Sequence, residues 1–425
     1  MNMTRSWILY DVGNSAFILL AASIIPIYFH HIAAADGISE SEYLAYWSVA
    51  AAFVTTVMLF LGPVLGSYSD RKGWRKTIFI ASVVIGALSC VACGLPEWWV
   101  AFLLIFVIAR IAYNASIVTY DGMLNDVATD EEMDSVSSNG YAMGYIGSCI
   151  PFIICLVFVV MSSLFDEPIS VAGLTIPIVF TFREAVIIGL IITAVWWVTM
   201  SLPLFRNYEQ RCYNDKVTRS IRESLMYFLS TLRDIAQNRA MLFFILAFFF
   251  YIDGVYTIMD LSTAFGESLG LGSVGLLGAL LLSQVILFPS TMIMSNLAKR
   301  YGAHRIIAVS IIGYLCISAY ATVLHSIEGF YILAVGVGLF QGSIQALSRS
   351  YFGKMVPKEK TGEYFGLLDI FGKGATIIGT FLVAILTPLT GDIRMVATIL
   401  LVMFGIGFLL FMMSVRERTF DAGSV

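Results

Sequence analysis

The sequence predicts an all-α membrane protein in which twelve transmembrane helices form two six-helix bundles. Hydrophobic residues make up 59% of the 425 positions, and charged residues only 13%. A soluble globular protein carries about a quarter charged residues, most of them on its water-facing surface. The missing charge therefore indicates a surface that faces lipid. One long polar stretch, with six apolar runs on either side, indicates the two bundles.

Each predicted span contains the roughly 20 apolar residues that cross a bilayer core about 30 Å thick. The first run contains Asp11 and Asn14 and lacks the basic front and cleavage site of a signal peptide, so we expect it to remain as a span. The twelve spans cover residues 7–29, 44–66, 76–95, 98–120, 140–162, 183–204, 241–265, 271–294, 304–325, 330–350, 363–387 and 393–415.

The polar stretch 206–239 separates an N-terminal bundle, residues 1–205, from a C-terminal bundle, residues 240–425. Apolar residues from Ile221 to Ile235 recur at helical spacing among charged ones, a pattern typical of a helix lying on a membrane surface. We interpret the stretch as an amphipathic cytoplasmic linker that tethers the bundles. A regulatory role is the alternative.

The basic residues predict the orientation of the chain. With twelve spans both termini share one side of the membrane, and 21 of the 25 lysines and arginines fall on that side. The positive-inside rule therefore puts both termini in the cytoplasm of a cell-membrane protein. The net charge of -4 and the absence of a basic face argue against nucleic acid as a partner.

The two halves of the chain resemble each other in sequence. The stretch from Gly66 to Lys76, between spans 2 and 3, has a counterpart between spans 8 and 9, where Arg300 matches Arg71 and Gly302 matches Gly73 at the same offset. Such repeats are the architecture of many secondary transporters, whose substrate site lies at the repeat interface near the membrane midplane.

The Gly66–Lys76 stretch also resembles the signature that the major facilitator superfamily carries between its second and third helices. Other segments are similar to the vacuole-effluxer branch of that superfamily, whose eukaryotic namesake is an autophagy-related exporter of amino acids from the yeast vacuole. The resemblance implies a transporter and assigns gating to Gly66, Asp70, Arg71 and Gly73. The similar segments are Trp7–Ala16, Ser138–Gly147, Tyr251–Val255 and Gln341–Gly353.

Charges inside spans cost about 2.5–3.5 kcal/mol each on insertion scales, so they face a partner or a wet cavity. Asp11 lies one turn inside span 1, whereas Arg110 and Asp253 lie near the midplane of spans 4 and 7. Asp369 and Lys373 are four residues apart on span 11, where they form either an intrahelical ion pair or part of the substrate site.

A zwitterionic amino acid needs an acid for its amine and an arginine for its carboxylate, and Asp253 and Arg110 supply both. A desolvated Asp253 is also suited to proton coupling. The alternative is that each charge has a structural ion-pair partner. Uncharged polar side chains in the spans either line the cavity or hold helices together. The leading ones are Asn14, Asn114, Tyr251, Gln341 and Gln345.

The cytoplasmic loops predict ion pairs at a gate. The segment 121–139 carries six acids and no base, whereas its repeat counterpart carries Arg349, Lys354, Lys358 and Lys360. We expect these groups to pair across the halves when the cytoplasmic side is shut, and each exposed pair to contribute only about 0–1 kcal/mol. The alternative is that the bases only set the topology.

These observations predict a secondary transporter and exclude an enzyme. The run Gly366–Gly374 fails the phosphate-loop spacing, the cysteines show no zinc pattern and the histidines lie at loop edges, so we expect no metal and no cofactor. The expected partners are a small amphipathic substrate such as an amino acid, protons and the lipid bilayer, with the chain a monomer. The competing hypotheses are a multidrug or lipid exporter and a transporter-like membrane sensor or scaffold.

Overall fold

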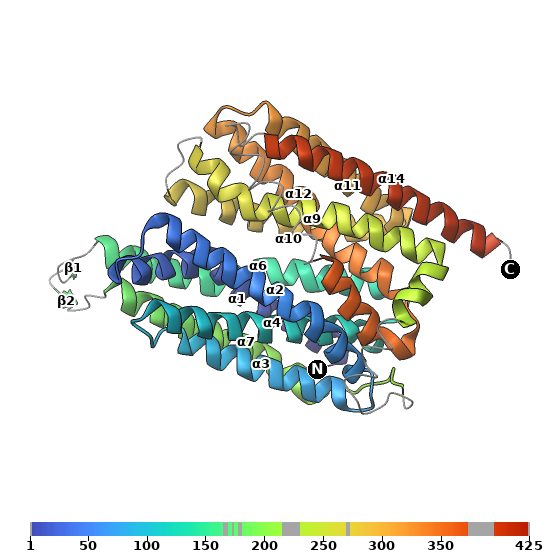
Figure 1. Ribbon diagram of the computed structural model, residues 1–425, viewed down its shortest axis with the longest axis horizontal. Coiled ribbons are helices and arrows are strands. Elements are labelled where there is room, and N and C mark those ends of the chain that lie inside the picture. The colour runs from blue at the N-terminus through green and yellow to red at the C-terminus, as the bar shows by residue number, and fades with distance from the viewer. Residues whose placement is uncertain are drawn as a thin grey trace. The chain divides into compact units, whose positions relative to one another are not determined.

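The computed structural model describes residues 2–164, 169–171, 174–176, 181–214, 230–268, 273–372 and 395–423 (Figure 1). Its long elements are all α-helices. In the first half these are α1 (Met3–Ala35), α2 (Glu40–Ser69), α3 (Trp74–Ala92), α4 (Trp99–Gly122), α5 (Leu124–Val127), α6 (Met133–Leu164) and α7 (Phe182–Asn207). In the second half they are α9 (Arg239–Ser268), α10 (Ser273–Tyr301), α11 (Ala303–Thr322), α12 (Ile327–Gly353) and α14 (Met395–Gly423). Residues 230–237 and 361–372 are also helical, and Lys358–Lys360 form a 3₁₀ turn.

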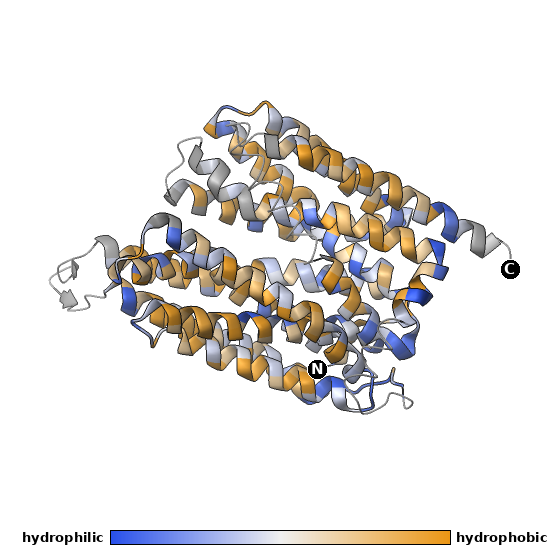
Figure 2. Cartoon of the chain, viewed as in Figure 1, coloured by the Kyte–Doolittle hydropathy of each residue, from blue (hydrophilic) through white to orange (hydrophobic). Residues whose placement is uncertain are grey.

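Eleven helices of the described residues are long and apolar enough to cross a membrane. They correspond to eleven of the twelve predicted spans. The predicted span 363–387 begins in the helix 361–372, and its remainder, including Lys373, lies outside the described residues. Hydrophobic residues dominate along the long helices (Figure 2). Large apolar side chains such as Leu88 and Leu104 are 67% and 61% exposed, as expected for surfaces that face lipid.

Two elements extend the predicted fold. Helix α6 begins at Met133, before the predicted start at 140, because hydropathy marks only the apolar part of a helix. Asp134 in its first turn is favoured by the helix dipole. In the outer loop, β1 (Ile169–Val171) and β2 (Leu174–Ile176) pair antiparallel.

Contacts between Cα atoms group the chain into two compact units. The first consists of Met1–Val57, Phe79–Ser116 and Met143–Tyr208, and in it α1 packs along α7. The second consists of Met58–Ile78, Ile117–Ala142 and Glu209–Val425, and in it α9 packs along α14 and α12 packs against α10 and α11. The second unit thus includes the ends of α2 and α4 and the start of α6. The division into bundles at 206–239 stays a prediction.

The repeat seen in the sequence has a backbone counterpart. Gly73, just before α3, has φ 79°, and Gly302, just before α11, has φ 89°. Side chains other than glycine rarely adopt this left-handed conformation, so glycine is required at both turns. The two positions that match in the repeat therefore make the same turn into a helix.

Candidate functional site

A buried ion cluster lies where α2 ends and α3 begins. The guanidinium of Arg75 lies between two carboxylates, with Nη2 2.5 Å from Oδ1 of Asp70 and Nη1 2.7 Å from Oδ2 of Asp126. The side chains of all three residues are at most 2% exposed. Arg75 also donates from Nη1 to the carbonyl of Gly122 (3.0 Å) and from Nη2 to Oγ1 of Thr361 (2.8 Å). We call Asp70, Arg75, Asp126 and Thr361 the Arg75 cluster.

Asp70 caps a helix that is distant in sequence. Its Oδ1 accepts the backbone N–H of Gly362 (2.7 Å), and its Oδ2 accepts that of Glu363 (3.0 Å), at the start of the helix 361–372. The first N–H groups of a helix lack intrahelical acceptors and carry partial positive charge, so a carboxylate there is stabilising. Burial raises the pKa of Asp70 above its ordinary value, while Arg75 and the two N–H groups act in the opposite direction.

The carboxylate of Asp126 has three hydrogen-bond partners. Its Oδ2 accepts from Arg75, and its Oδ1 accepts the backbone N–H groups of Arg211 (3.0 Å) and Cys212 (2.6 Å). Cys212 therefore lies beside a buried acid. Burial, together with the charge of Asp126, raises the pKa of the Cys212 thiol to about 11. The segment that follows α7 is thus attached to the cluster.

Glycines let α2 and the helix 361–372 approach closely. A Cβ atom on Gly66 would lie 2.4 Å from the carbonyl oxygen of Gly362, and one on Gly366 would lie 2.9 Å from that of Gly62. The glycines are four residues apart on each helix, which places them on one face and allows backbone contact. This contact brings the N–H groups of Gly362 and Glu363 within reach of Asp70.

Arg349 is the centre of a second buried cluster, at the end of α12. Its Nη1 lies 3.0 Å from Oδ1 of Asp121, and its Nε donates to Oγ of Ser137 (2.9 Å). The guanidinium also lies over the rings of Tyr141 (4.3 Å to the centroid) and Tyr120 (5.5 Å). Arg349 is 5% exposed, so these contacts replace most of its hydration. We call these five residues the Arg349 cluster.

The predicted pairing of the acidic segment with the later bases is confirmed for Arg349, Lys354 and Lys358, whereas Lys360 pairs with Asp234 of the linker instead. Lys354 lies 2.7 Å from Asp134, whose other oxygen accepts from Oγ of Ser350 (2.7 Å). Lys358 lies 3.4 Å from Asp130, with both side chains more than half exposed. Because water screens that last pair, it contributes little compared with the buried pairs.

The other predicted gating residues make different contacts. The guanidinium of Arg71 lies over the ring of Tyr68, 4.4 Å from its centroid, and Arg75 makes the ion pairs instead. The N–H of Gly73 donates to Oε1 of Gln210 (2.8 Å). Sequence reasoning did not single out Arg75 or Asp126. The signals were the second arginine of the loop signature and one acid of the segment 121–139 that follows span 4.

In the first unit, two polar residues of α1 are paired within the helix. Nδ2 of Asn14 lies 3.2 Å from Oδ1 of Asp11, and both residues are buried. Asn114 is buried on α4, and Arg110, one turn earlier, is half-buried. Asp11, Asn14 and Asn114 therefore lie inside the protein, whereas Arg110 is partly exposed.

In the second unit, Asp253 is fully buried on α9, and Oγ1 of Thr257 donates to its Oδ1 at 3.4 Å. The hydroxyl of Tyr251 lies 2.7 Å from Oγ of Ser348. Asp369 is half-buried, whereas its expected partner Lys373 lies outside the described residues. Gln341 and Gln345 are buried on α12. Arg110 belongs to the first unit and Asp253 to the second, and their joint role in one site stays a prediction.

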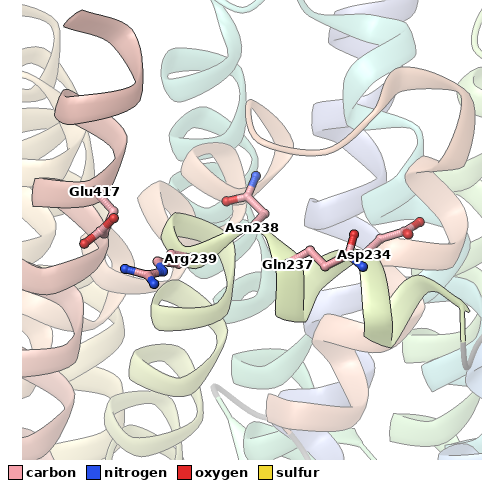
Figure 3. A pocket seen from close by; sticks show the side chains of 5 residues that line it. All are labelled: Asp234, Gln237, Asn238, Arg239 and Glu417. Atoms are coloured by element: carbon pink, nitrogen blue, oxygen red, sulfur yellow. The ribbon is translucent and has the colours of Figure 1, made fainter. Parts of the chain in front are cut away.

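A polar pocket lies at the start of α9, away from these residues (Figure 3). None of the predicted substrate residues lines it. Its lining residues are Asp234, Gln237, Asn238 and Arg239, together with Glu417 of α14.

Comparison with known proteins decides the family. The family model for "Vacuole effluxer Atg22 like" proteins matches residues 39–423. The chain belongs to this vacuole-effluxer family. It is 36% identical to the MFS-type transporter YxiO of Bacillus subtilis over 420 residues, covering 98% of this chain and 96% of the relative. It is 21% identical to autophagy-related protein 22 of Saccharomyces cerevisiae, covering 92% of this chain and 88% of that one.

Solved structures of major facilitator transporters share the fold of this vacuole-effluxer family member. The human organic anion transporter MFSD10 has a TM-score of 0.71 at 14% identity, covering 96% of this chain and 98% of that one. The Escherichia coli fucose:proton symporter has a TM-score of 0.69 at 13% identity, covering 97% of both chains. The protein is therefore a multi-pass membrane transporter of the major facilitator type and not an enzyme.

Proposed function

We propose that this vacuole-effluxer homologue is a secondary active transporter that moves an amino acid across the cell membrane by proton-coupled alternating access, with both termini in the cytoplasm. The observation that carries the proposal is the Arg75 cluster. A buried arginine between two buried carboxylates, one of which caps the helix 361–372, is an ionic contact that can form and break as a unit.

We assign the Arg75 and Arg349 clusters together to a cytoplasmic gate. Residues 70–126 supply Asp70, Arg75 and Asp126, and residues 349–363 supply Arg349 and the capped helix start. In the closed state the charges satisfy one another. In the open state water must replace these partners. Because buried pairs are costly to break one partner at a time, the gate favours two discrete states over a continuum.

The substrate assignment rests on charge chemistry. Asp253 is a fully buried carboxylate on a membrane-crossing helix, and intramembrane acids mark substrate or proton pathways. It would bind the amine of an amino acid or carry the coupling proton, and Arg110 would bind the carboxylate. The family description "vacuole effluxer" supports a metabolite as substrate.

The test is thermal stabilisation of the purified protein by amino acids, sugars, nucleosides and apolar cations, because a ligand that binds only the folded state raises its stability. We expect an amino acid to raise the melting temperature of the wild type but not of Asp253→Asn or Arg110→Ala. Glu328→Gln, at the start of α12, is the control and should respond as the wild type does. A shift with an apolar cation or a lipid alone would overturn the amino-acid assignment.

Proton coupling needs a separate measurement in proteoliposomes. An imposed pH gradient should drive accumulation of the stabilising amino acid in the wild type. Asp253→Asn should not accumulate it, because the side chain no longer carries a titratable proton. Accumulation by Asp253→Asn that equals the wild type would remove Asp253 from the coupling role.

A further inference from the structure

The segment 208–214, which follows α7, lies against the loop that holds Asp70. Gln210 makes three hydrogen bonds through its amide: Oε1 accepts the N–H of Gly73 (2.8 Å), and Nε2 donates to the carbonyls of Ser69 (2.9 Å) and Cys212 (3.3 Å). The N–H of Asn214 donates to the carbonyl of Asp70 (2.7 Å). The segment therefore holds the loop on both sides of the Asp70 side chain.

The same segment also holds the opposite end of the Arg75 cluster. The N–H groups of Arg211 and Cys212 both donate to Oδ1 of Asp126, whose Oδ2 receives Arg75. Two backbone donors on one buried carboxylate are charge-assisted hydrogen bonds, which are about twice as strong as neutral ones. The segment therefore links Asp126 to the loop that holds Asp70 and keeps the two acids in place around Arg75.

The far end of the linker contacts the capped helix. The hydroxyl of Thr231 donates to Oε1 of Glu363, which is only 4% exposed. Lys360 lies 3.3 Å from Asp234, which lines the pocket at the start of α9 (Figure 3). Both described ends of the linker thus contact residues that belong to, or directly adjoin, the Arg75 cluster.

We propose that residues 208–214 are a strap that forms a third part of the cytoplasmic gate, with Gln210 as its positioning residue. The inference rests on the proposed gate and extends it. The strap holds Asp126 and the loop around Asp70 in the arrangement in which both acids pair with Arg75 and Asp70 reaches the helix 361–372, so it stabilises the closed gate and does more than tether the two halves of the chain. Removing the Gln210 amide favours opening because its hydrogen bonds are lost from the closed state.

The test uses accessibility to a water-soluble maleimide in the full-length protein in membranes, measured on individual cysteine peptides by mass spectrometry. Cys212 reports release of the strap. A second reporter is Ser138→Cys in a Cys212→Ser background, because Ser138 is 1% exposed on α6 and becomes reactive only when the gate opens. The variants are Gln210→Ala, Arg75→Ala and the control Arg206→Ala, whose side chain is exposed at the end of α7.

We expect Gln210→Ala to raise the alkylation rate at both reporters by about tenfold, because the variant loses the two hydrogen bonds that hold Gln210 to Gly73 and Ser69. Arg75→Ala should raise both by more, and Arg206→Ala should change neither. If Gln210→Ala exposes Cys212 but leaves the Ser138→Cys reporter protected, the strap only covers the gate and the inference is wrong. If Arg75→Ala also leaves that reporter protected, the gate assignment itself fails.

Discussion

The carboxylate of Asp70 accepts the backbone N–H of Gly362 at 2.7 Å, although 292 positions of sequence separate the two residues. Asp70 lies at the end of α2 and Gly362 at the start of the helix 361–372. The acid therefore has two functions at once, as the partner of Arg75 and as the cap of a helix. Loss of either function should be measurable separately.

Neutralising Asp70 should weaken the closed gate. Asp70→Asn keeps the shape of the side chain but removes a charge from Arg75, and losing one partner of a buried ion pair costs about 3–5 kcal/mol. We expect a lower melting temperature and a higher alkylation rate at the Ser138→Cys reporter. The control is Arg300→Ala, one residue after the repeat position that matches Asp70; its side chain is exposed over Tyr301, and its loss should leave both values unchanged. A wild-type alkylation rate in Asp70→Asn would contradict the prediction.

Two glycines of α2 provide a matched pair of alanine substitutions that test the contact between α2 and the helix 361–372. A Cβ on Gly66 would lie 2.4 Å from the carbonyl oxygen of Gly362, whereas one on Gly62 would lie 3.6 Å from that of Gly366. Gly66→Ala should therefore force the helices apart at a cost of about 1–3 kcal/mol, as overpacking does. Gly62→Ala should be nearly neutral. Thermal unfolding checks both, and equal melting temperatures for the two variants would show that α2 can shift freely.

The Arg349 cluster should require arginine and not just positive charge. Arg349→Lys retains the charge but loses the planar contacts with Tyr141 and Tyr120 and the fork of donors to Ser137. We expect both Arg349→Lys and Arg349→Ala to destabilise the closed state by about 2–3 kcal/mol. Lys358→Ala removes the exposed pair with Asp130 and should cost about 0–1 kcal/mol. If the closed state of Arg349→Lys is as stable as that of the wild type, the contacts with the aromatic rings do not contribute to its stability.

The thiol of Cys212 should lose its proton only at high pH. Its pKa is raised to about 11, so only about 0.1% of the Cys212 side chain is thiolate at pH 8. A free thiol with a pKa of about 8.5 is roughly one quarter thiolate at the same pH. The rate of alkylation should therefore rise about tenfold per pH unit between pH 8 and 10 and show no plateau below pH 10. Asp126→Asn removes the negative charge beside the thiol and should lower the apparent pKa. A wild-type plateau near pH 9 would show that the thiol is solvated.

The sequence predicts the membrane-crossing helices well because hydropathy depends on composition and not on partners. Charge predicts the pairing of Asp134 with Lys354, since the acidic segment 121–139 and the basic segment that is its repeat counterpart attract each other. Arg75 is different. Whether it or Arg71 enters the cluster depends on how α3 is rotated after the turn at Gly73, and that rotation is set by packing. The sequence does not predict the strap either, because most of its contacts use backbone N–H groups. Every residue except proline has such a group, so these contacts leave no pattern in the sequence.

The burial of the Arg75 cluster has a consequence for the solvent conditions under which the protein turns over. Because the side chain of Arg75 is 0% exposed, every donor and acceptor released on opening must be hydrated, and the open state holds more bound water than the closed one. Osmolytes excluded from protein surfaces penalise such hydration. Sucrose or trehalose should thus slow transport in wild-type vesicles and have less effect on Arg75→Ala.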